Sequence, residues 1–67
     1  MIIEAFTLEE LMLVKSCHTY DREKAIRELK SYLKDVEPAL AMTIHNTVDK
    51  LEDLNPEEFL EVADYPI

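Results

Sequence analysis

Glycine and tryptophan are absent from this chain of 67 residues, and cysteine occurs once. Without glycine, the positive φ angles of tight hairpin turns are unfavourable, so we expect turns with ordinary backbone angles and no short β-hairpins. The lack of glycine also excludes phosphate-binding glycine loops. The single cysteine, Cys17, cannot form a disulfide within the chain, and no secretory leader pattern is visible, so we expect a cytoplasmic protein.

Long apolar runs and basic side chains are also scarce. The run "LMLV", Leu11 to Val14, has four residues, far fewer than the roughly 20 that a membrane-spanning helix needs. Seven Lys and Arg stand against 15 Asp and Glu, which gives a formal net charge of −8. A charge of this sign opposes approach to phosphate backbones and anionic lipid. We therefore expect no membrane span and no direct contact with nucleic acid.

Helix-starting patterns recur along the chain. Thr7 followed three residues later by Glu10 has the spacing of a capping box. Asp21 or Thr19 is suited to cap a second helix, Glu37-Pro38 to begin a third, and Asn55-Pro56 to begin a fourth. The sequence predicts one all-α domain, residues 1–67, formed by a small bundle of three helices plus a short C-terminal fourth helix. The expected helices cover residues 8–17, 21–36, 38–54 and 56–62.

The apolar side chains of the second and third predicted helices recur at spacings of three and four residues, which places them on one stripe per helix. These stripes are expected to form the core. The first predicted helix is different because it is apolar almost all round. Either it is sandwiched within the bundle, or it leaves a patch exposed for a protein partner or a homodimer. We name Leu13, Val14, Cys17 and Met42 as the contact residues of such a patch.

Residues that could carry chemistry are few. Cys17 and His18 are adjacent, but a catalytic pair needs a third, orienting group, and a tetrahedral zinc site needs four ligands. Only His45 is left to join them. We therefore predict no catalytic residues, no metal site and no cofactor, and we expect Cys17 to be a buried or half-buried thiol.

Charge is unevenly distributed along the chain. Residues 15–34 carry six basic side chains against three acidic ones, whereas residues 35–67 carry nine acidic side chains against Lys50. Arg27, Lys30 and Lys34 lie on the polar side of the second predicted helix, where they would offer an electrostatic contact to an acidic partner. The acidic half would suit a basic partner. The alternative is a solvated face with weak internal ion pairs.

Three segments carry a family resemblance: "FTLEEL" at residues 6–11, "CHTYDREKAIRELKSYL" at residues 17–33, and "TVDKLEDLNPEEFLEV" at residues 47–62. Together they resemble the transposon-transfer assisting proteins, which are small acidic proteins of conjugative transposons in Gram-positive bacteria. The resemblance implies a role in the transfer of a mobile genetic element. It supplies no catalytic residue to carry over.

Two functional hypotheses follow. The first is a noncatalytic accessory protein that acts by protein–protein contact in conjugative transposon transfer. The second is an acidic decoy that mimics DNA phosphates and occupies a basic nuclease or restriction protein, which the net charge of −8 suggests.

Overall fold

Helices account for most of the chain in the computed structural model, which describes residues 2–66. Within those residues there is no β-strand, so the prediction of a small all-α bundle with a short fourth helix is confirmed. In chain order the elements are a 3-10 helix η1 (Ile2–Ala5), α1 (Leu8–Ser16), α2 (Arg22–Tyr32), a 3-10 helix η2 (Leu33–Asp35), α3 (Pro38–Glu52) and α4 (Pro56–Ala63).

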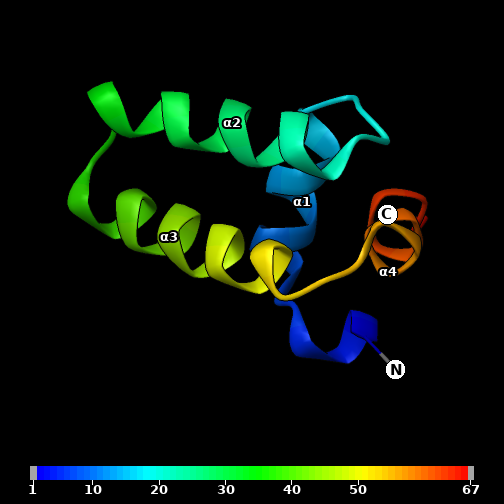
Figure 1. Ribbon diagram of the computed structural model, residues 1–67. Coiled ribbons are helices and arrows are strands. Elements are labelled where there is room, and N and C mark those ends of the chain that lie inside the picture. The colour runs from blue at the N-terminus through cyan, green and yellow to red at the C-terminus, as the bar shows by residue number, and fades with distance from the viewer. Residues whose placement is uncertain (1, 67) are drawn as a thin grey trace.

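Helix α1 lies at the centre of the arrangement, because α2, α3 and α4 all pack against it. Helices α2 and α3 run antiparallel beside each other, and α1 crosses behind them (Figure 1). Helix α4 lies at one end of this arrangement, where it packs against α1 and η1. The first and last described helices, η1 and α4, therefore lie side by side (Figure 1).

Three helix starts are capped by side chains, as the sequence predicts. Thr7 accepts a hydrogen bond from the Glu10 backbone N–H at 3.2 Å, and the Glu10 carboxylate accepts one from the Thr7 N–H at 2.8 Å. Asp21 caps α2, and Asn55 caps α4. The Asn55 cap is also a capping box, because the Glu58 carboxylate accepts a hydrogen bond from the Asn55 backbone N–H. The sequence analysis did not predict this second bond.

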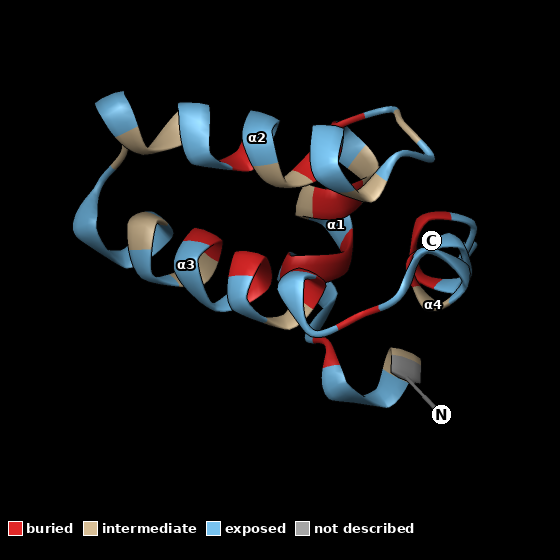
Figure 2. Ribbon diagram, in the orientation of Figure 1, coloured by how far each residue is buried: buried red, intermediate tan, exposed pale blue. Residues whose placement is uncertain are grey.

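The buried side chains of all four α-helices meet in one core, which faces inward between α1, α2 and α3 (Figure 2). Leu29, Ile44, Leu51 and Phe59 are fully enclosed in it. Among the described residues two polar side chains are buried, Glu10 and Thr47, and the Thr47 hydroxyl donates to the Thr43 carbonyl at 2.7 Å. The apolar stripes predicted for the second and third helices therefore form the centre of the core.

The apolar first helix is covered on one side and open on the other: Leu8 and Met12 are 61% and 55% exposed, whereas the opposite side packs into the bundle. Val14 and Cys17 keep only 1% and 6% of their surface exposed, and Leu13 is partly buried against the core. The prediction of a partner-binding patch that includes Val14 and Cys17 is wrong, because α2, α3 and α4 all pack on α1 and cover these side chains.

Helix ends differ from the predicted ones by one to four residues. The second helix was expected to reach residue 36, but α2 ends at Tyr32 and continues only as the tighter η2. The cause is Pro38, which excludes a helical Glu37, and both Val36 and Glu37 are extended. The third helix ends at Glu52 instead of residue 54, and α1 and α4 end within one residue of expectation.

The turn after α1 contradicts the expectation of ordinary backbone angles. His18 has a φ of 50°, in the left-handed region that glycine usually occupies after a helix. Its N–H donates to the Lys15 carbonyl at 3.1 Å, which satisfies one of the last carbonyls of α1. A side chain with a Cβ in this conformation costs about 1–2 kcal/mol.

We expect His18→Gly to raise the free energy of unfolding by about 1 kcal/mol, because the backbone clash is removed while the capping bond stays. Urea denaturation followed by circular dichroism measures this change. Ser16→Gly is the matched control, since Ser16 lies within α1, where glycine lowers stability by up to about 1 kcal/mol. A His18→Gly chain less stable than the unmodified one would contradict the prediction.

Candidate functional site

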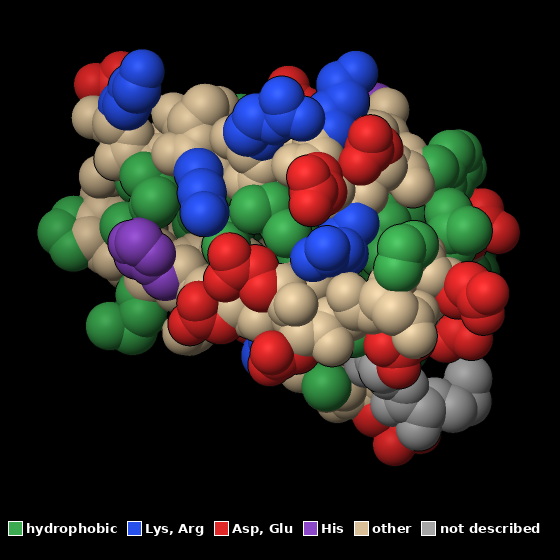
Figure 3. All heavy atoms as spheres, viewed as in Figure 1, with side chains coloured by type: hydrophobic (Ala, Val, Ile, Leu, Met, Phe, Trp, Pro, Cys, Tyr) green, Lys and Arg blue, Asp and Glu red, His purple; other side chains and the backbone are tan. Residues whose placement is uncertain are grey.

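The two ends of the chain are purely acidic, and the fold brings them together. Residues 1–14 and 51–67 contain nine acidic side chains and no Lys or Arg, a formal charge of −9. Residues 15–50 contain seven basic and six acidic side chains, a formal charge of +1. Because η1 packs on α4, the acidic ends share one side of the molecule. Figure 3 shows Lys and Arg over α2, and Asp and Glu along α3 and around α4.

A hollow of about 460 Å³ lies where η1, α4 and the C-terminal turn meet. We call it the acidic groove. Leu60 and Tyr65 contribute apolar surface to it and are 44% and 40% exposed. Two of its side chains, Glu61 and Asp64, are acidic, and none is basic. Its lining residues are Ile3, Leu60, Glu61, Asp64, Tyr65 and Pro66.

The periodicity of α4 explains why these side chains face outward. Phe59, Val62 and Ala63 are buried and fix the inner face of the helix. The outward positions then fall at spacings of three and four residues, and all four are exposed: Glu57, Leu60, Glu61 and Asp64. Helix α4 therefore presents three carboxylates with one leucine among them.

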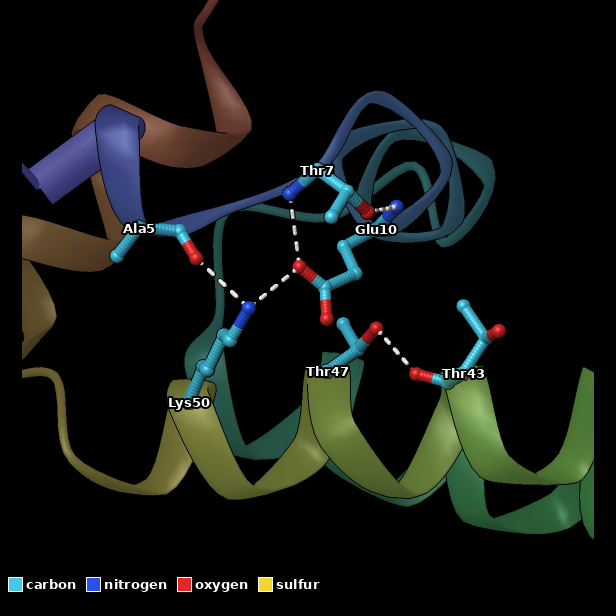
Figure 4. A network of polar contacts seen from close by, with 6 residues as sticks. All are labelled: Ala5, Thr7, Glu10, Thr43, Thr47 and Lys50. Atoms are coloured by element: carbon cyan, nitrogen blue, oxygen red, sulfur yellow. Dashed lines mark hydrogen bonds and ion pairs between the residues drawn. The ribbon is translucent and has the colours of Figure 1, made fainter.

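An ion pair between a buried carboxylate, Glu10, and a partly exposed ammonium, Lys50, holds the η1 side of the groove in place. The Lys50 ammonium, on α3, donates to the Glu10 carboxylate at 2.6 Å and to the Ala5 carbonyl at 2.7 Å (Figure 4). It also lies 5.5 Å from the centre of the Phe6 ring. Since Ala5 is the last residue of η1 and Glu10 belongs to α1, Lys50 ties both elements to α3. Ile3 reaches the groove from the segment fixed in this way.

The electrostatics of this pair are set by competing effects on Glu10, which is 3% exposed. Burial by itself raises the pKa of the Glu10 carboxyl, but the hydrogen bonds from Lys50 and Thr7 together outweigh it and hold the pKa below its usual value. Because the folded-state pKa is lowered, the stability that the pair contributes is present above the usual carboxyl pKa and is lost as the pH falls through the folded value.

The three predicted basic contact residues, Arg27, Lys30 and Lys34, differ in their surroundings. Arg27 lines a hollow of about 460 Å³ on the outer side of α2, with Lys24, Glu28 and Ser31. Lys30 pairs with Glu52 of α3 at 3.7 Å. Lys34 is exposed on η2. These side chains share one side of the molecule, but Lys30 already has an internal partner.

The predicted apolar contact residues are not brought together. Met42 is 66% exposed on α3, whereas Val14 and Cys17 belong to the core. The exposed apolar residues that the sequence reasoning did not single out include Leu60 and Tyr65. The spacing of Phe59, Val62 and Ala63 would have indicated Leu60, because a helix with that inner face turns position 60 outward.

Cys17 shows no sign of an activated thiol. Its sulfur lies 3.5 Å from the Leu13 carbonyl oxygen and 3.8 Å from that of Ala25. Burial, with a further contribution from the Glu28 charge, raises the pKa of the Cys17 thiol to about 11. The expectation of a buried thiol is confirmed.

Across residues 2–66, no three His, Cys, Asp or Glu side chains come together in a way that could hold a metal ion. No helix in this part of the chain has the length and apolar character needed to cross a bilayer.

No protein-family model, curated protein or solved structure matches the chain.

We expect Lys50→Met to lower the free energy of unfolding by about 2 kcal/mol at neutral pH, because it leaves the buried Glu10 carboxylate without its cation. Urea denaturation measures the loss. Lys30→Met is the matched control: its pair with Glu52 is about half exposed on both sides, so it should cost less than about 1 kcal/mol. Equal losses in the two variants would refute the special role of Lys50.

We expect alkylation of Cys17 by iodoacetamide at pH 8 to be about 100-fold slower in the folded chain than in the urea-unfolded chain. The raised thiol pKa leaves far less thiolate, which is the reacting form. Mass spectrometry over time measures both rates. Equal rates would mean that the thiol is accessible and ordinary.

Proposed function

We propose that this chain is a noncatalytic accessory protein that acts in the transfer of a conjugative transposon by binding a protein partner. The mobile-element setting comes from the resemblance of "FTLEEL", "CHTYDREKAIRELKSYL" and "TVDKLEDLNPEEFLEV" to transposon-transfer assisting proteins. In this proposal the protein works in the cytoplasm, where the DNA to be transferred is processed.

The acidic groove is the observation that supports a protein contact. It combines half-exposed apolar side chains, Leu60 and Tyr65, with the carboxylates of Glu61 and Asp64. Apolar surface gives a partner something to bury, and a uniform sign of charge selects partners of the opposite sign and speeds their encounter. A basic protein that handles DNA has that charge. The DNA itself would be repelled by the same carboxylates.

The outer side of α2 offers a second, weaker contact in this proposal. Arg27 and Lys34 make no ion pair within residues 2–66. Lys30 would give up its exposed ion pair with Glu52 for a partner carboxylate at little cost in free energy. These three cations would favour an acidic region of the same partner and orient it on the bundle.

A DNA-mimicking decoy is the second candidate, and the row of outward carboxylates favours it. Asp49 on α3 and Asp53 at its C-cap are exposed, and so are Glu57 and Glu61 on α4 and Asp64 at its C-cap. A decoy would occupy the phosphate-binding surface of a basic nuclease or restriction protein. Its binding would collapse as the salt concentration rises from about 0.05 to about 0.5 M, whereas docking through Leu60 and Tyr65 would largely persist.

We expect deletion of the gene to lower the frequency of conjugative transfer from its natural host, and the wild-type gene to restore it. A triple variant, Glu57→Gln with Glu61→Gln and Asp64→Asn, should restore about tenfold less, because removing three interface charges costs on the order of 1.4 kcal/mol of binding. Transconjugants per donor cell are counted.

A matched control removes the same number of charges elsewhere, outside both proposed contact surfaces: Glu9→Gln with Asp35→Asn and Glu37→Gln. All three residues are exposed and far from α4 in the chain. This variant should restore transfer fully. Unchanged transfer after gene deletion would overturn the proposed function, and equal defects in both triple variants would show that net charge matters and the α4 surface does not.

A further inference from the structure

We propose that the acidic groove binds an amphipathic helix of the partner, one that turns Leu or Ile side chains toward Leu60 and Tyr65 and Lys or Arg side chains toward Glu61 and Asp64. The inference rests on the proposed function, since it names the chemistry of the partner segment. It starts from the fact that apolar and acidic side chains line the same hollow.

The apolar part of the groove is suited to receive side chains. The whole hollow measures about 460 Å³ and is largely open to solvent, so it offers room for a few side chains and not for a whole helix. Ile3 is partly buried against the core and gives the groove a fixed wall. Leu60 and Tyr65 stay about two-fifths exposed beside it. One or two aliphatic side chains entering the groove would cover all three.

None of the described residues that line the groove is Lys or Arg. Within residues 2–66, the Glu61 carboxylate makes no ion pair or hydrogen bond, and neither does the carboxylate of Glu57 one turn before it. Asp64 accepts a 3.4 Å hydrogen bond from the Tyr20 hydroxyl, which supplies no positive charge. Complementarity therefore requires cations from outside, on the same partner segment that fills the apolar part.

The partner segment is inferred to be a helix because the groove offers side chains and no free main chain. Residues 2–66 contain no strand, so there is no sheet edge to which an extended peptide could add. The backbone N–H groups of Asp64 and Tyr65 are already bonded to the Leu60 and Val62 carbonyls. A helix carries its own main-chain hydrogen bonds and presents apolar and basic side chains at spacings of three and four residues. Leu60 and Asp64 are four residues apart, and Glu61 and Asp64 are three apart, so side chains at the same spacings on a partner helix could meet them.

The test uses a synthetic peptide of about 14 residues, or four helical turns, with Leu on one face and Lys on the others. Binding to the full chain is measured by fluorescence anisotropy, and the contact surface is mapped by amide NMR shifts. We expect the largest shifts at Leu60, Glu61, Asp64 and Tyr65. A peptide with the same composition and no apolar face should bind at least about tenfold more weakly, and one with Glu in place of Lys should not bind.

Substitutions then separate the groove from the rest of the surface. We expect Leu60→Ala to weaken peptide binding about tenfold, and Glu61→Gln with Asp64→Asn to weaken it about fivefold and to flatten its salt dependence. Leu8→Ala is the matched control, because Leu8 is 61% exposed on α1, outside the acidic groove. It should leave the affinity unchanged. Circular dichroism checks that each variant keeps its helices.

Three results would overturn the inference: shifts centred on α1 or α2, equal affinity for the scrambled peptide, or no effect of Leu60→Ala. The proposed function is judged separately by conjugation. If Leu60→Ala abolishes peptide binding and transfer is unaffected by gene deletion, the groove stands and the function fails. If gene deletion lowers transfer but Leu60→Ala leaves peptide binding unchanged, the proposed function is supported and the role of the acidic groove is refuted.

Discussion

The ion pair between Lys50 and Glu10 is the contact on which the arrangement of the N-terminal part depends. Forty residues separate the two side chains, yet their atoms lie 2.6 Å apart, and the same ammonium holds the last carbonyl of η1. Glu10 also completes the cap of α1, so one carboxylate serves both a local and a long-range contact. Leaving a buried carboxylate without its cation lowers the stability of the fold, so the contact between Lys50 and Glu10 resists separation. Lys50 thereby sets where η1 lies.

The position of η1 decides the character of the surface beside it. Two chain ends that carry only acidic side chains would repel each other if nothing held them together. Burial of Phe59 and Val62 on α4, and of Phe6 after η1, supplies the attraction that overcomes this repulsion. The result is a concentration of negative charge around partly exposed apolar groups.

Much of the fold could be read from the sequence, because helix signals are local. The caps at Thr7, Asp21 and Asn55 depend on side chains two or three residues away, and the stripes of α2 and α3 follow from a period of 3.6 residues. The left-handed turn at His18 was not foreseen, since nothing in a helix pattern requires it where glycine is absent. The shortened α2 could have been foreseen more closely from Pro38.

Residue patterns alone were enough to predict an all-α protein with four α-helices, a strongly acidic charge and an apolar first helix. Only the tertiary structure decided which side of that first helix is covered, because Val14 and Cys17 are buried by helices that follow later in the chain. It also decided that Ile3 and Leu60 line one groove and that Lys50 meets Glu10. Local patterns fix the direction in which a side chain leaves its own helix, whereas contacts across 40 or more residues depend on how the whole core packs.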